Sequence, residues 1–156
     1  MHPLSNHTRV WRNCFTSLLA AALMLGPACA EPLPDDPTPA RIFSACVLPE
    51  PLVPSGHDAT EMENRALAKC LNRFQNRTGS DDFSALENFA TANPTSPWRL
   101  AILTNLGLLQ YRVGYFSRCL LSFRAAWDAG KNATDLKAKA LADRAVGGYT
   151  KMLASK

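Results

Sequence analysis

The chain has 156 residues, of which 17 are lysine or arginine and 13 are aspartate or glutamate, so its formal net charge is +4. Its basic residues form no single-sign block and no stripe with interleaved aromatic residues, which argues against a nucleic-acid partner. The sequence also has no Ser-His-Asp or Cys-His set, no glycine-rich phosphate loop and no metal-ligand spacing of cysteine and histidine. We therefore expect no enzymatic activity, no cofactor and no bound metal.

The first 30 residues have the pattern of an export signal. Arg9 and Arg12 precede an apolar run over residues 14–25 that is too short to span a bilayer, and Ala-Cys-Ala at 28–30 offers a cleavage site. We expect a signal peptide over residues 1–30 with cleavage near Ala30, and export to the periplasm or the exterior. The alternatives are a retained membrane anchor and a lipid on Cys29, and the membrane is a partner only in those two cases.

Residues 31–57 are rich in proline and show no sustained period. This composition is typical of an extended linker or tail. Only the stretch Arg-Ile-Phe-Ser-Ala-Cys-Val-Leu, residues 41–48, has enough apolar side chains to lie against a folded part. The folded domain is expected to span residues 58–156, a length that allows one small core.

Alanine and leucine at helical spacing dominate the sequence from Asp58 onward. Segments rich in turn residues or proline interrupt this pattern, and no run alternates as a strand would. The periodicity predicts five helices, over residues 60–75, 81–92, 97–113, 116–129 and 135–153. The fold class is therefore expected to be all-α, built from antiparallel helical hairpins.

The third and fourth expected helices carry a pattern of small and aromatic residues, Leu106, Gly107, Gly114, Phe116, Cys119, Phe123 and Ala126. A displacement of about 34 residues finds a matching set one helix pair earlier, Ala85, Phe89, Ala92 and Pro97. The pattern resembles the tetratricopeptide repeat, a pair of helices about 34 residues long. The resemblance implies a short solenoid of about two repeats, closed by the helix over residues 135–153. The alternative is an ordinary helical bundle.

The resemblance also implies a role for these residues. A small residue at 107 lets the two helices of one repeat approach closely, and Gly114 allows the turn between them. Cys119 lies where only a small side chain fits beneath the neighbouring helix. Phe116 and Phe123 are expected to fill the space between the helices.

In a tetratricopeptide array, the first helices of the repeats form a concave groove for a peptide or a partner helix. Carried onto this chain, the resemblance implies the candidate partner-binding residues Arg65, Lys69, Asn72, Arg73, Asn105, Leu108, Tyr111 and Arg112, with Met62 and Thr104 beside them. This set would suit an extended peptide with an acidic group or a free carboxylate. The alternative is that Arg65, Lys69 and Arg73 are the solvated face of one helix.

Three cysteines follow the expected signal peptide, Cys46, Cys70 and Cys119. An odd number in an exported chain is most simply explained by one disulfide and one free thiol, and the candidate pair is Cys46 with Cys70. The alternative is three reduced cysteines in the core, since cysteine is among the most often buried residue types.

Taken with the resemblance, these features imply an exported module that binds a protein or peptide partner. Residues 97–131 also resemble the helical-repeat region that some exported bacterial proteins carry before a larger domain, such as an RHS-repeat shell or a cysteine peptidase. The alternative is therefore a docking part or N-terminal remnant of a larger exported enzyme or RHS-type protein, without catalytic activity of its own. A structural remnant without any ligand is the third hypothesis.

Overall fold

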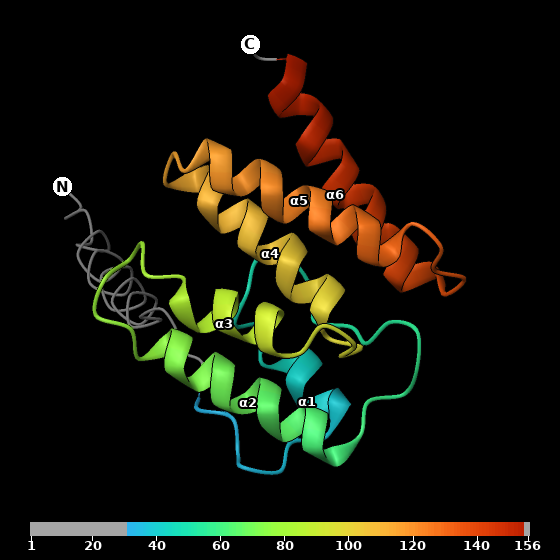
Figure 1. The fold of residues 1–156 in the computed structure, drawn as a ribbon. Coiled ribbons are helices and arrows are strands. Elements are labelled where there is room, and N and C mark those ends of the chain that lie inside the picture. Colours follow the sequence, from blue (N-terminus) through green and yellow to red (C-terminus); the bar gives the residue numbers. More distant parts are fainter. Residues whose placement is uncertain (1–30, 155–156) are drawn as a thin grey trace, which may run out of the picture.

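The computed structural model describes residues 31–154, so the expected signal peptide lies outside the described residues. Within residues 31–154 the chain forms six α-helices and no strand (Figure 1). They are α1 (Pro39–Ser44), α2 (Glu61–Gln75), α3 (Ser84–Ala92), α4 (Arg99–Arg112), α5 (Phe116–Gly130) and α6 (Leu136–Ala154). The all-α prediction is confirmed, and α2 to α6 match the five expected ranges to within three residues at each end. The short helix α1 was not predicted.

Side chains that cap the first turns determine where two of these helices begin. At the start of α2, Thr60 Oγ1 accepts a hydrogen bond from the Glu63 backbone N–H, and the Glu63 carboxylate accepts one from the Thr60 backbone N–H at 2.9 Å. At the start of α6, Asp135 Oδ2 accepts a hydrogen bond from the Ala138 backbone N–H at 2.8 Å. These contacts satisfy backbone donors that have no partner within the first helical turn.

Successive helices pack as antiparallel hairpins, visible in Figure 1. Helix α2 packs on α3, α4 packs on α5, and α6 packs on both α4 and α5, while contacts between α3 and α4 join the two hairpins. The buried Trp98, just before α4, adds a second link because its Nε1 donates to Asn64 Oδ1 of α2 at 3.1 Å. The result is a stack of two hairpins and a closing helix. No helix in residues 31–154 is both long and apolar enough to cross a membrane.

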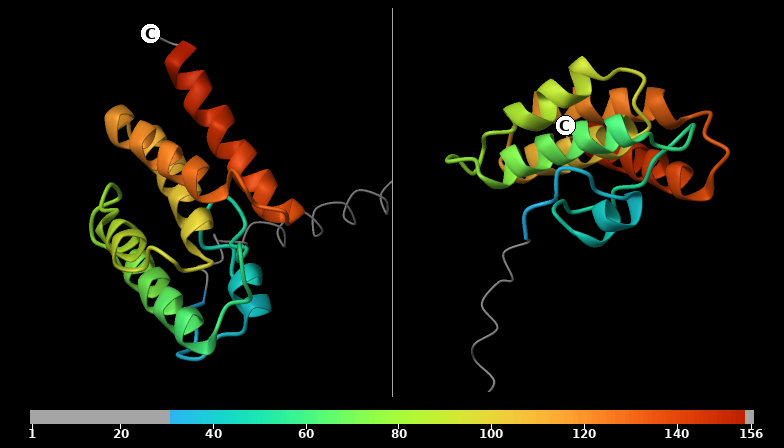
Figure 2. Two further views of the ribbon diagram at one scale, coloured as in Figure 1. Left: turned by 45° about the vertical axis from the view of Figure 1, so that its right-hand side comes forward. Right: turned by 90° about the horizontal axis from the view of Figure 1, so that it is seen from below.

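The proline-rich segment before α2 is packed onto this stack. Five of its apolar side chains are buried in the core, those of Leu33, Ile42, Leu48, Leu52 and Val53. The right-hand view in Figure 2 shows α1 and its flanking chain on one side of α2 and α3 on the other. Residues 31–57, whose composition indicates a linker or tail, therefore form a third layer against the helices.

Two of the glycines in the expected pattern meet specific structural needs. A Cβ added to Gly107 would lie 2.6 Å from two ring carbons of Phe123, so only glycine lets α4 approach α5 this closely at that point. Gly114 has a φ of +82° in the turn between the same two helices, a conformation that L residues with a side chain rarely adopt. Both positions agree with the roles that the pattern implies.

Of the other residues of the pattern, some are buried and two are exposed. Phe123, Cys119 and Ala126 are buried, but Phe116 is 55% exposed. Because Phe116 is the first residue of α5, its ring lies at the end of the hairpin and packs on Tyr111, with ring centroids 5.9 Å apart. The expectation that Phe116 fills the space between the helices is wrong. Ala92, the last residue of α3, is also exposed.

The structure does not join Cys46 to Cys70, contrary to the expected disulfide. Both are free, as is Cys119. Cys70 is buried on the side of α2 that faces α3, where its Sγ donates to the Ala85 carbonyl oxygen at 3.2 Å, while Cys46 is exposed. Burial raises the pKa of the Cys70 thiol to about 12 and that of the Cys119 thiol to about 11.

Candidate functional site

Asn72 of α2 holds the backbone of the segment that precedes α1. Its side-chain amide donates from Nδ2 to the Leu33 carbonyl oxygen at 2.9 Å and accepts at Oδ1 from the Leu33 N–H at 2.9 Å. One amide group therefore satisfies both backbone groups of one residue that lies outside any helix or strand. The Leu33 side chain is buried beside this contact.

Asn105 of α4 makes the same kind of contact with Glu50. Its Oδ1 accepts from the Glu50 N–H at 2.7 Å, and its Nδ2 donates to the Glu50 carbonyl oxygen at 3.1 Å and to the Ala101 carbonyl oxygen at 2.9 Å. Asn105 is fully buried. Two of the residues expected to hold a partner peptide thus hold two stretches of the chain's own N-terminal segment.

Two arginines pair with carboxylates of the same segment. Arg65 Nε of α2 lies 2.6 Å from Asp36 Oδ1, and Arg144 Nε of α6 lies 2.9 Å from Glu50 Oε1. The side chains of Arg65 and Asp36 are largely exposed, so we expect this pair to contribute only about 0–1 kcal/mol to stability. These two ion pairs favour a carboxylate at positions 36 and 50 of the segment.

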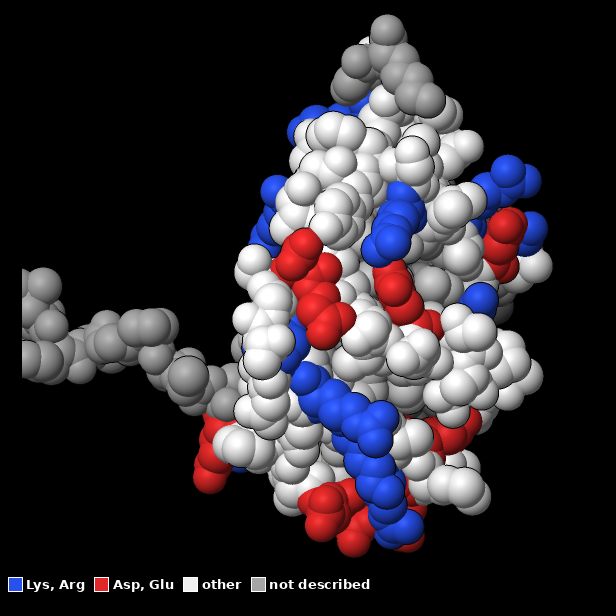
Figure 3. All heavy atoms as spheres, turned by 60° about the vertical axis from the view of Figure 1, so that its left-hand side comes forward, with Lys and Arg blue, Asp and Glu red and all other residues white. Residues whose placement is uncertain are grey.

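Lys69 and Arg73 of α2 do not take part in the contact that Asn72 makes with Leu33. They line a surface depression of about 510 Å³ between α2 and α3, together with Cys70 and Asn88. Figure 3 shows one face of the molecule, on which basic side chains form a line with acidic side chains above and below it. The depression between α2 and α3 includes none of the other expected partner-binding residues.

Leu108, Tyr111 and Arg112 of α4 lie together at an open cavity of about 280 Å³ between α4 and α6. The facing residues of α6 are Arg144, Gly147, Gly148 and Lys151. Lys151 Nζ lies 6.0 Å from the Tyr111 ring centroid. The residues that line this cavity include three cations and no carboxylate. Arg144 already pairs with Glu50, and Arg112 makes the cavity suitable for a negatively charged group.

The residues of α6 in this cavity are not among the expected partner-binding residues, which all lie on α2 and α4. A signal for them does exist in the sequence. Leu141-Ala142 follows Leu106-Gly107 by 35 residues, which places α6 in the same structural register as α4.

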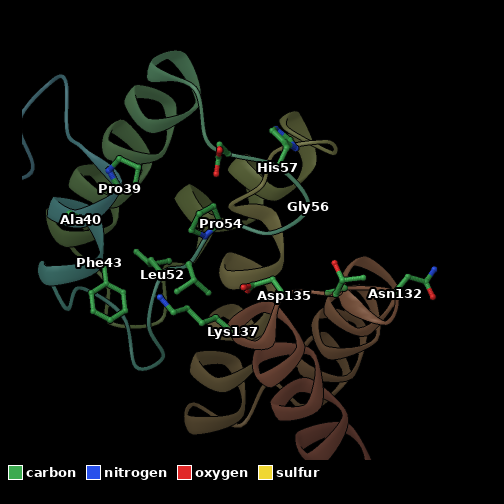
Figure 4. A pocket seen from close by; sticks show the side chains of 14 residues that line it. Pro39, Ala40, Phe43, Leu52, Pro54, Gly56, His57, Asn132, Asp135 and Lys137 are labelled. Atoms are coloured by element: carbon green, nitrogen blue, oxygen red, sulfur yellow. The ribbon is translucent and has the colours of Figure 1, made fainter.

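A further cavity, of about 870 Å³, lies between the segment around α1 and the loop before α6 (Figure 4). In Figure 4 the Lys137 side chain extends toward Leu52 and Phe43, while His57 lies away from them. Two of the polar side chains that line this cavity already have partners. Asp135 caps α6, and His57 Nε2 lies 3.2 Å from Glu63 Oε1. Within residues 31–154 no group of three or more histidine, cysteine, aspartate or glutamate side chains is arranged to hold a metal ion.

No protein-family model, curated protein or solved structure matches this chain. The function proposed below therefore rests on the contacts of its own residues.

Proposed function

We propose that the chain is an exported protein-interaction module of the tetratricopeptide kind, without catalytic activity, that holds an extended segment of a partner protein on the face formed by α2, α4 and α6. The observation that carries this proposal is the pair of asparagine contacts. Asn72 and Asn105, on the first helices of the two hairpins, each bind the N–H and the C=O of one residue that lies outside any helix or strand, Leu33 before α1 and Glu50 in a bend after it.

Contacts of this kind recognise a backbone that has no partner of its own in a helix or a sheet. They suit an extended segment of any sequence, because every residue except proline carries the same two groups. Selectivity then has to come from side chains. On this face the selectivity is for acidic groups, since Arg65 and Arg144 already hold carboxylates and Arg112 and Lys151 line the open cavity.

The part of the face that is open to a partner is the cavity between α4 and α6. A partner segment placed there would contact Leu108 and Tyr111 through apolar groups and would direct a carboxylate toward Arg112. A bidentate bond between arginine and a carboxylate is among the stronger polar contacts that proteins make.

Affinity capture from a periplasmic extract tests this function. The full chain is compared with the variants Arg112→Glu and Lys139→Glu, which make the same charge change at two exposed positions. We expect the native chain and Lys139→Glu to retain the same protein and Arg112→Glu to lose it, while circular dichroism shows the same cooperative melting for all three. Equal retention by both variants would show that the cavity does not bind the partner.

A further inference from the structure

We propose that the α2 side of this face is a binding site for an acidic segment without helix or strand structure, in which an apolar residue precedes a carboxylate by three positions, and that residues 31–37 occupy this site within the chain. We call residues 31–37 the resident segment. The inference deepens the proposed function, on which it rests, by naming the kind of partner segment that α2 takes.

The contacts between α2 and the resident segment define this partner. Asn72 holds both backbone groups of Leu33, whose side chain is buried, and Arg65 holds the carboxylate of Asp36. Asp35, between them, is exposed and has no polar contact with α2. The site therefore binds an apolar residue at position 33 and a carboxylate at position 36. A segment of another chain with the same spacing of these two residues can make the same contacts.

The resident segment is weakly attached compared with the chain that follows it. Of its seven residues only Leu33 and Pro37 are buried, and within the described part of the chain its backbone makes no hydrogen bond to another backbone group. Its two ion pairs, Asp36 with Arg65 and Glu31 with Arg41, are largely exposed. Glu50, in contrast, lies between the buried residues Leu48 and Leu52, and the nearby Ser55 N–H donates to the Pro97 carbonyl oxygen at 2.8 Å. Segments with few buried contacts open locally at a lower free-energy cost than the rest of a protein. We infer that residues 31–37 leave the site and can be replaced there by a partner segment, while residues 48–55 stay in place.

Figures 1 and 2 show the start of the described chain, in blue, passing beside α2 before α1 begins. We expect release of residues 31–37 to leave α1 in place, because its capping residue Thr38 and its buried Ile42 lie outside the resident segment. The exposed site then consists of Asn72, Arg65 and the surface that covered Leu33.

The probe for this site is a fluorescently labelled peptide with the sequence of residues 31–37, Glu-Pro-Leu-Pro-Asp-Asp-Pro, added to the full chain and followed by fluorescence anisotropy. The chain variant Asp36→Lys weakens the resident segment, because it replaces the carboxylate at Arg65 with a like charge. Asp35→Lys is its matched control, one residue away and without a contact on α2. We expect the peptide to bind the Asp36→Lys chain about fivefold more tightly than the Asp35→Lys chain, in line with the small contribution of an exposed ion pair.

Peptide variants test the contacts without altering the fold of the chain. A peptide with N-methyl leucine lacks the N–H that donates to Asn72 Oδ1. We expect this peptide to bind the Asp36→Lys chain at least fivefold more weakly than the unmodified peptide does. N-methylation at the residue matching Asp35 should leave binding unchanged. Equal binding to the Asp36→Lys and Asp35→Lys chains, or equal binding of the two N-methyl peptides, would overturn the inference. If the peptide fails in these ways while capture still depends on Arg112, the proposed function stands without this inference. If the peptide behaves as expected but capture does not depend on Arg112, the proposed role of the α4–α6 cavity fails instead.

Discussion

The ring of Phe123 on α5 lies against the backbone of Gly148 on α6, so that a Cβ added to Gly148 would lie 2.7 Å from two of its carbon atoms. The opposite edge of the same ring meets Gly107 on α4. One aromatic side chain is thus held between two glycines, and it determines how closely both α4 and α6 approach α5.

The variant Gly148→Ala should lower the free energy of unfolding. An added methyl group in this contact forces the ring or α6 to move, and overpacking of this kind costs about 1–3 kcal/mol, which the better helix propensity of alanine offsets by up to about 1 kcal/mol. Denaturant unfolding with linear extrapolation measures the difference.

Gly147→Ala is the matched control, because a Cβ at Gly147 meets no atom within 4 Å. This neighbouring change should raise the free energy of unfolding by up to about 1 kcal/mol through helix propensity alone. If both variants changed stability in the same direction and by the same amount, the contact between Phe123 and Gly148 would not matter for the packing of α6.

The variant Asn105→Ala should release the chain around Glu50. It leaves the Glu50 N–H and C=O without their partner, and loss of such a partner costs about 1–3 kcal/mol when the groups are buried. We expect a lower free energy of unfolding and faster hydrogen exchange of the Glu50 amide.

Thr104→Val provides the comparison for Asn105→Ala. Thr104 is equally buried, but its hydroxyl bonds only to the Leu100 carbonyl of its own helix, at 3.0 Å. Loss of this bond within the helix should cost less than about 1 kcal/mol and should not change exchange at Glu50. Fast exchange at Glu50 in both variants would show that Asn105 does not hold this stretch.

Stability should depend on pH through Glu63. The hydrogen bond from the Thr60 backbone N–H, assisted by the Thr60 hydroxyl and by His57, lowers the pKa of Glu63 below its ordinary value of 4.5. A group with a lowered pKa in the folded state contributes stability above its unfolded pKa and loses it as the pH falls through the folded pKa. Glu63→Gln should therefore be less stable than the native chain near neutral pH, and the difference should shrink below about pH 4.5.

Thermal melts between pH 2 and pH 7 measure this difference for Glu63→Gln, and Glu61→Gln controls for the removal of a carboxylate from the same helical turn. A constant difference between the native chain and Glu63→Gln across this range would contradict the role of Glu63 in capping α2.

Of the three cysteines in the described chain, only Cys46 should react with iodoacetamide at pH 8 in the native protein. The thiolate is the reactive form, and burial raises the pKa of Cys70 and Cys119 to about 12 and about 11. Mass spectrometry of the alkylated chain should show modification at Cys46 before denaturation and at all three sites after it. A disulfide-linked pair of peptides containing Cys46 and Cys70 would instead restore the pairing expected from the sequence.

The sequence by itself was enough to predict five of the six helices in the described part of the chain, α2 to α6. Apolar spacing marks α2 to α6 within a few residues, because each helix has a continuous face to bury and clear residues that interrupt it at its ends. It also indicated Gly107 and Gly114 as special positions, since glycine is unfavourable within a helix unless a close contact or a turn requires it. These signals are local, and a local signal can be read without knowing the fold.

Only the tertiary structure decided what lies on the candidate binding face. Asn72 and Asn105 could be placed there by position, but their partners Leu33 and Glu50 are 39 and 55 residues away in the sequence. Proline interrupts the local pattern in the segment that contains these partners. Only residues 41–48 indicated contact with the folded part, and neither Leu33 nor Glu50 lies among them. The burial of this segment follows from apolar surface that α2 and α4 leave uncovered, and that surface exists only after the helices have packed.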